Sequence, residues 1–90
     1  MYKIVNGKGT GKTKALLVKA ADEGAIVICK DPDAMKTRAL MYGLYDLRIM
    51  GYDGFEEARA LSEVYIHDVD DFLDWYYAGA VKGYTMTYEP

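Results

Sequence analysis

The sequence predicts a three-layer α/β domain with a mostly parallel sheet of about five strands. Short apolar runs typical of strands alternate along the chain with stretches of helical periodicity. The stretches between successive runs are long enough to cross from one parallel strand to the next. The composition, 51% hydrophobic and 28% charged, is that of a folded chain, and its 90 residues predict a single domain spanning positions 1–90.

The first part of the chain is expected to run from a strand through a loop and a helix to a second strand. Tyr2 to Val5 is a short, mostly apolar segment that predicts the first strand. A helix is expected to begin near Lys12 and to end before Gly24, which stands where a C-terminal cap is expected. Residues 25–29 form a continuous apolar run, the pattern of a parallel strand covered on both faces.

The rest of the chain continues the alternation. Asp31 and Pro32 predict a helix start, because the Asp side chain caps free N–H groups and proline loses nothing at the first helical position. The alternating β-forming residues near the end predict a last strand. The expected elements are helices over 32–42, 53–61 and 69–77 and strands over 47–50, 64–66 and 84–88.

The most specific signal is a glycine-rich loop between the first strand and the first helix. It follows the pattern G-x-x-x-x-G-K-[ST], in which backbone N–H groups surround a phosphate, the lysine reaches its outer oxygens and the hydroxyl ligates Mg²⁺. Asn6 stands in place of the first glycine, but Asn tolerates left-handed conformations and a glycine follows it. A chance Gly-Lys-Thr in a turn is the alternative, and the flanking strand and helix disfavour it. The predicted nucleotide-binding residues are Asn6, Gly7, Lys8, Gly9, Thr10, Gly11, Lys12, Thr13 and Lys14.

This motif resembles the phosphate-binding loop of P-loop nucleoside triphosphatases. The resemblance implies a P-loop NTPase-like domain that binds ATP, or another nucleoside triphosphate, together with Mg²⁺. Hydrolysis in that family also needs an acid on a neighbouring strand. Residues 64–73 look like the Walker B segment of helicases and related ATPases, where an apolar strand ends in two acids and a helix follows.

Two alignments of the Walker B segment stay open. Alignment on the following helix puts His67 at the magnesium-binding acid and Asp68 at the water-orienting acid, whereas alignment on the strand makes Asp68 the magnesium acid. A neutral histidine is a poor ligand for Mg²⁺, which prefers oxygen. Thr85 resembles the threonine of a sensor strand that reports on the γ-phosphate. We therefore predict Thr13 and Asp68 as metal ligands and Asp68, His67 and Thr85 as catalytic residues.

Each of these residues also has a purely structural interpretation. Asp68 and Asp70 can serve as ordinary helix caps after a strand. His67 can be a hydrogen-bonded histidine at a strand end, and Thr85 can reflect β propensity alone. One arginine could act as a finger across a subunit interface, but sequence does not choose among the three, which are Arg38, Arg48 and Arg59.

As a whole, the chain resembles the small P-loop proteins of phages and mobile elements, which look like one stripped-down RecA-like helicase core. The resemblance implies a minimal ATP-binding protein with Mg²⁺-dependent, weak or partner-dependent hydrolysis, acting in phage nucleic-acid metabolism. The alternative is an interaction module that binds nucleotide or phosphate without turnover and docks to a protein partner or to a second copy. A nucleotide kinase is a weaker third hypothesis, because no lid or second phosphate site is evident.

Net charge and cysteine content bear on the binding partners and the cellular compartment that the sequence predicts. The net charge of −3 gives no general electrostatic reason to bind nucleic acid, so such binding would need a local basic patch. Cys29 is the single cysteine, which excludes an intramolecular disulfide and fits a reducing compartment. The sequence contains neither a long apolar run nor a signal peptide, so we expect a cytoplasmic protein without membrane contact, in the host cytoplasm if phage-encoded.

Overall fold

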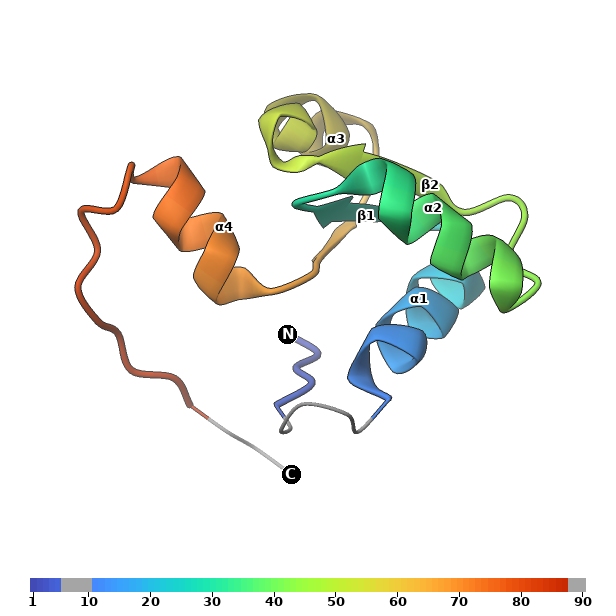
Figure 1. Cartoon of the computed structure of the whole chain (residues 1–90), viewed down its shortest axis with the longest axis horizontal. Coiled ribbons are helices and arrows are strands. Elements are labelled where there is room, and N and C mark those ends of the chain that lie inside the picture. The colour runs from blue at the N-terminus through green and yellow to red at the C-terminus, as the bar shows by residue number, and fades with distance from the viewer. Residues whose placement is uncertain (6–10, 88–90) are drawn as a thin grey trace.

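The computed structural model describes residues 1–5 and 11–87. In this part of the chain the sheet has three parallel strands, with β1 in the centre between β2 and β3. Figure 1 shows β1 and β2 side by side, with α2 (Pro32–Met41) in front of them. Val27 of β1 pairs with Ile49 on one side and with Tyr65 on the other. The strands are β1 (Ile26–Cys29), β2 (Arg48–Gly51) and β3 (Val64–Ile66).

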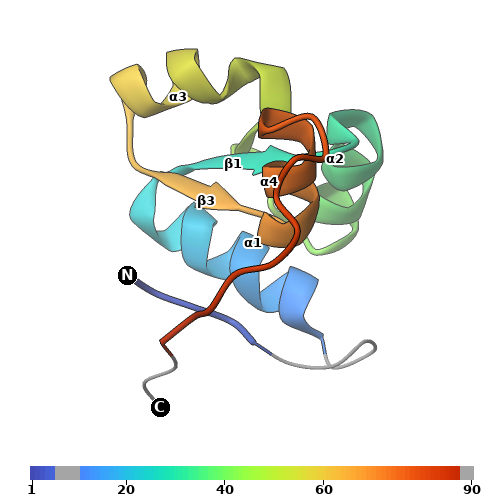
Figure 2. The same cartoon turned by 90° about the vertical axis from the view of Figure 1, so that its left-hand side faces the viewer.

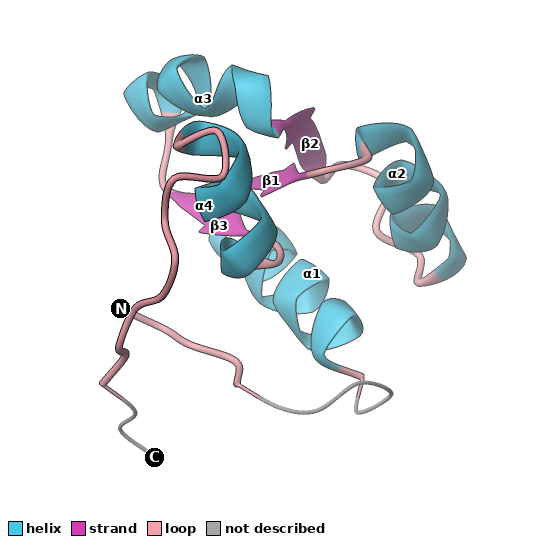
Figure 3. Cartoon of the chain, turned by 60° about the vertical axis from the view of Figure 1, so that its left-hand side comes forward, coloured by secondary structure: helices cyan, strands magenta, loops and turns pink. Residues whose placement is uncertain are grey.

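Helices cover both faces of this sheet (Figure 3). The first two helices pack on one face, and the last two, with a short 3₁₀ turn, pack on the other. The elements are α1 (Lys12–Glu23), α2 (Pro32–Met41), the 3₁₀ turn η1 (Tyr52–Gly54), α3 (Phe55–Leu61) and α4 (Val69–Tyr76).

The central strand β1 joins the two halves of the core. Its four residues are all buried, as the continuous apolar run predicts. Successive side chains of a strand point to opposite faces, so Val27 and Cys29 join the cluster under α1 and α2. Ile26 and Ile28 join the cluster under α3 and α4. Burial on both faces therefore fixes the strand in the middle of the sheet.

The helix boundaries follow the local signals closely. Gly24 ends α1 in the left-handed conformation, with φ of 65°, and its N–H bonds back to the last turn. Asp31 caps α2 by accepting a hydrogen bond from the N–H of Ala34 at 3.1 Å, and Pro32 opens the helix. These two signals confirm the predicted end of the first helix and start of the second.

The predicted sheet of about five strands is wrong. The described chain forms a small α/β domain with a three-stranded parallel sheet, which is too small for a five-strand P-loop fold. Tyr2–Val5 and residues 84–87 have no regular structure, and position 88 of the predicted last strand lies outside the described residues. A strand requires a partner for its backbone groups, and β propensity does not supply one.

The two terminal segments make side-chain contacts in place of a strand ladder. The ring of Tyr2 meets the ring of Tyr65 edge-on at 6.3 Å, and the Lys3 ammonium donates to the carbonyl of Thr87. Figure 2 shows the two segments crossing beside α1 at the foot of the domain. Tyr84 adds a contact by donating its hydroxyl hydrogen to Asp70 of α4. These segments therefore lie next to each other without extending the sheet.

Candidate functional site

The first turn of α1 lies at the carboxyl edge of the parallel sheet. Gly11 precedes the helix with φ of 75°, a conformation that glycine adopts without strain, and as the N-cap residue it provides no side-chain capping hydrogen bond. The first turn contains no acidic residue, so its N–H groups and the helix dipole favour an anion. Of the predicted phosphate loop, residues 6–10 lie outside the described residues, and Gly11, Lys12, Thr13 and Lys14 lie within them.

Thr13 contacts His67, which follows directly after β3. The Thr13 hydroxyl oxygen lies 3.1 Å from Nε2 of His67, and Thr13 is 9% exposed. These residues are far apart in sequence, and they meet because α1 packs against β1 and β3 with its N-terminus at the carboxyl edge. The predicted phosphate-loop threonine and the predicted Walker B segment are thus adjacent through His67.

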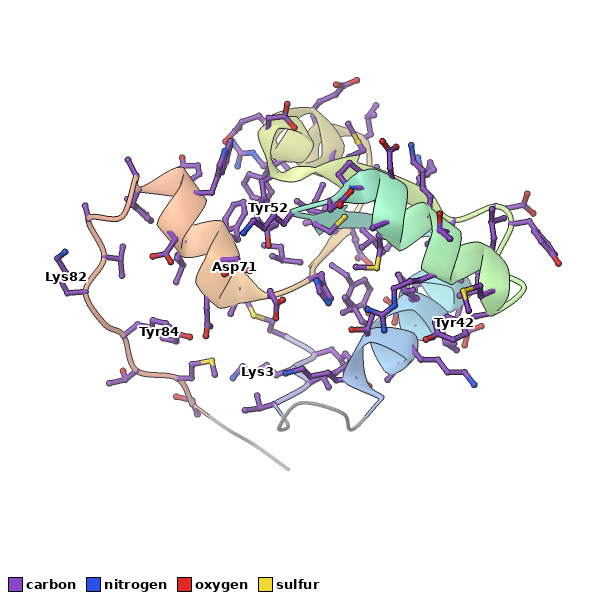
Figure 4. All side chains as sticks on the ribbon, in the orientation of Figure 1. Lys3, Tyr42, Tyr52, Asp71, Lys82 and Tyr84 are labelled. Carbon is purple, nitrogen blue, oxygen red and sulfur yellow. The ribbon has the colours of Figure 1, made fainter. Side chains whose placement is uncertain are left out.

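The backbone of His67 is held from two sides. Its N–H donates to the carbonyl of Ile28 in β1 at 2.9 Å, and its carbonyl accepts from the Tyr52 hydroxyl at 2.8 Å. Tyr52 is itself buried beneath α4, where its ring packs edge-on against Phe72 with centroids 5.3 Å apart (Figure 4). The imidazole therefore projects from a fixed backbone position toward Thr13.

Asp68 lies on the other side of the imidazole. Its Oδ2 is 3.7 Å from Nδ1 of His67, and half of its side chain is exposed. It occupies the N-cap position of α4 with φ of 57°, but its side chain makes no capping hydrogen bond. The structural interpretation of Asp68 as a helix cap is therefore not seen, whereas a strand-end hydrogen bond is seen for His67, with Thr13 as its partner.

Burial, aided by nearby positive charges, keeps the imidazole neutral at neutral pH. Burial is the main cause that lowers the pKa of His67, and the positive charges of Arg38 and Lys12 lower it further against the opposing effect of Asp68. Neutral imidazole has one nitrogen that accepts a hydrogen bond or binds a metal. Nε2 is the nitrogen that faces Thr13.

Arg38 is the arginine that belongs to this neighbourhood, and sequence alone did not single it out. It lies on α2, which shares one face of the sheet with α1, and its charge acts on His67. Arg48 instead donates to the Gly24 carbonyl at 2.9 Å, toward the opposite edge of the sheet. Arg59 pairs with Glu56 at 2.8 Å. The sheet topology is the signal that separates the three arginines.

Two predicted site residues have side chains in other surroundings than the Thr13–His67 pair. Thr85 is exposed in the irregular C-terminal segment. Lys14 follows Thr13 in α1, but its side chain turns toward α2, where its ammonium lies 5.5 Å from the centre of the Tyr42 ring (Figure 4). Of the predicted catalytic and metal-binding residues, the structure brings Thr13 and His67 into contact, with Asp68 beside the imidazole.

A separate recess opens between α4 and the carboxyl ends of β1 and β2. Its volume is about 570 Å³, and its wall includes Trp75, Asp71 and Asp74 of α4. None of its lining residues belongs to the described part of the phosphate loop. The lining is Lys30, Pro32, Gly51, Tyr52, Asp53, Asp71, Asp74 and Trp75.

The described side chains do not form a complete metal site on their own. Within residues 1–5 and 11–87, no group of three or more His, Cys, Asp or Glu residues is placed to hold a metal ion. Thr13 and His67 supply two donors, so a metal bound by this pair would need further ligands.

Comparison with known proteins finds no relative of this chain. No protein-family model, no curated protein and no solved structure matches the chain. None of the helices in the described segments has the length and apolar character needed to cross a membrane. Any functional assignment therefore rests on the residues of the chain itself.

Proposed function

We propose that this chain binds a nucleoside triphosphate through its phosphate groups at the N-terminus of α1. The supporting observation is that the helix carrying Gly11, Lys12 and Thr13 begins at the carboxyl edge of a parallel sheet, with Thr13 against the residue that ends β3. In open α/β sheets, ligands bind outside the carboxyl ends of the strands. A helix that begins at a glycine without an acidic residue in its first turn, and the glycine-rich sequence before it, suit a phosphate.

We assign the chain weak or partner-dependent hydrolysis at most. Efficient phosphoryl transfer to water needs a metal held by carboxylate oxygen and a positioned water-activating residue. Here an imidazole stands next to Thr13, and the Asp68 carboxylate lies beyond that imidazole. Arg38 is a candidate to stabilise charge on the phosphates, because its charge already reaches His67.

Thermal unfolding with added nucleotide tests the proposal. A ligand that binds only the folded state at a hundredfold excess over Kd stabilises it by about 2.7 kcal/mol, which raises the Tm of so small a domain by about 10 °C or more. ATP and GTP are each added with MgCl₂ or MnCl₂, and inorganic phosphate is the control for simple anion binding. No shift at millimolar nucleotide with either metal would refute the proposal.

Phosphate release under the same conditions separates a weak enzyme from a binding module. Turnover above the uncatalysed rate, alone or with added single-stranded nucleic acid, supports the enzyme. Saturable nucleotide binding without any release supports the interaction module.

A further inference from the structure

The donor atoms at the predicted metal position do not match the preference of magnesium. Mg²⁺ binds almost entirely through oxygen, whereas the atom next to the Thr13 hydroxyl is an imidazole nitrogen of His67. Imidazole is a common ligand of Mn²⁺, Co²⁺, Zn²⁺ and other first-row divalent metals. The mismatch with Mg²⁺ concerns Thr13 and His67, the pair of donor side chains that meets at the N-terminus of α1 in the described part of the chain.

The spacing of the two donor atoms suits a single metal ion. Two ligands that bind one metal at right angles, with bonds of about 2.1 Å, lie about 3.0 Å apart. The Thr13 hydroxyl oxygen and Nε2 of His67 are separated by 3.1 Å. A metal can therefore bind both atoms in place of their mutual hydrogen bond with little movement of either side chain.

The surroundings orient the imidazole for this role. Ile28 and Tyr52 hold the backbone of His67 on both sides. The Asp68 carboxylate lies toward Nδ1, on the side of the ring away from Thr13. A carboxylate that accepts a hydrogen bond from the other nitrogen of a metal-ligating histidine fixes its tautomer. At 3.7 Å, Asp68 is close to Nδ1 but is not hydrogen-bonded to it. Nε2, which faces Thr13, is the nitrogen available to a metal.

We infer that the nucleotide is bound together with an imidazole-accepting divalent cation such as Mn²⁺ in preference to Mg²⁺, with Thr13 and His67 as its protein ligands. This inference rests on the proposed nucleotide binding. Because these two side chains fill only part of the coordination shell of a divalent metal, phosphate oxygens of the nucleotide and water supply further ligands. The metal therefore arrives with the nucleotide and does not bind tightly without it.

The single histidine of the chain makes a direct spectroscopic test possible. The protein is labelled with ¹⁵N-histidine, mixed with Mn²⁺ and ATP, and examined by pulsed electron paramagnetic resonance. Direct ligation gives a ¹⁵N hyperfine coupling that is absent from unlabelled protein and from Mn²⁺ with labelled protein but no ATP. If labelled protein that binds Mn²⁺–ATP shows no coupling to nitrogen of the imidazole, the inference is overturned.

Affinity measurements give an independent test. Wild-type protein should bind Mn²⁺–ATP at least about tenfold more tightly than Mg²⁺–ATP, because Mn²⁺ accepts an imidazole ligand that Mg²⁺ disfavours, and even loss of a group that only orients a metal ligand typically costs about 10–100-fold in affinity. His67→Asp replaces nitrogen by oxygen and should bring the two affinities close together. His67→Gln controls for loss of the side chain, and circular dichroism checks that each variant is folded.

The outcomes distinguish a failure of the inferred metal preference from a failure of the proposed nucleotide binding. Equal binding of Mg²⁺–ATP and Mn²⁺–ATP by wild-type protein, unchanged in His67→Asp, overturns the metal preference and leaves nucleotide binding intact. Failure to bind ATP with either metal overturns the proposed function, and the metal preference falls with it.

Discussion

Replacing Phe72 by Ala should strongly destabilise the domain. Phe72 is 7% exposed and is the buried residue of α4, whereas Trp75 and Tyr76 on the same helix are each about half exposed. Its ring lies 5.3 Å from that of Tyr52 and 5.1 Å from that of Phe55. A Phe→Ala change in a core costs about 3–5 kcal/mol, a large part of the roughly 5–13 kcal/mol expected for a domain of this size.

Urea unfolding measures this loss with a built-in reporter. Trp75 is the single tryptophan, and its ring centre lies 6.0 Å from that of Phe72, so its fluorescence follows the packing of α4 while far-UV circular dichroism follows the helices. Leu61→Ala is the matched control, since Leu61 is 65% exposed and should change stability by no more than about 0.5 kcal/mol. Phe72→Leu, with a smaller loss of about 1.5 kcal/mol, keeps the measurement possible if the Ala variant does not fold. A loss for Phe72→Ala no larger than that for Leu61→Ala would refute the assignment of Phe72 as the anchor of α4.

Three further predictions concern the site and the core. Lys12→Ala should weaken ATP binding at least about tenfold in isothermal titration, with little change in the free energy of unfolding. Lys14→Ala is the control and should weaken binding less, because the Lys14 ammonium lies over the Tyr42 ring. Equal effects of the two substitutions would argue against Lys12 as the phosphate ligand. Asp68→Asn should lower any phosphate release more than about tenfold, a barrier change above about 1.4 kcal/mol, while changing ATP affinity far less; unchanged release would remove Asp68 from the mechanism. Burial raises the pKa of the Cys29 thiol from 9.0 to about 11, so the contribution of the buried neutral thiol to stability is fully present below pH 9 and is lost as the pH rises toward 11. At pH 8, alkylation of Cys29 should therefore occur only as fast as the chain unfolds, and rapid labelling of the native protein would contradict this.

Local signals in the sequence were sufficient where the physics is local. Asp31 and Pro32 predicted the start of α2 because a cap and a proline act within one helical turn. The uninterrupted apolar run at 25–29 predicted a parallel strand covered on both faces, because burial on both faces is what such a run favours. Each prediction used only nearby residues of the sequence, and the structure confirms both.

The terminal strands could not be predicted correctly because pairing is a long-range property. Residues 84–87 alternate in the way that strands do, but the pattern does not specify a neighbour, and these residues lie in an irregular segment. The same holds for Tyr2–Val5, where the Tyr2 ring packs on Tyr65 and the backbone joins no strand. The expectation of about five strands failed at these two segments.

The candidate site was only partly predictable for a similar reason. The Gly-Lys-Thr sequence predicted the start of α1. One of the two Walker B alignments put His67 at the magnesium-binding acid, which stays a prediction, and the contact of His67 with Thr13 was not predicted. The choice of Arg38 over the other arginines depended on the sheet order and on which helices share a face. Sequence spacing contains no information about that order.

The smaller sheet does not remove the basis for phosphate binding. The position of Thr13 against His67 depends on α1, on β3 and on the hydrogen bond from the His67 N–H to the Ile28 carbonyl in β1. All three elements are present, and none of them involves the two segments wrongly predicted as strands. A domain that keeps the carboxyl edge of β1 and β3 therefore retains the geometry on which the proposed nucleotide and metal binding depend, whether or not further strands flank the sheet.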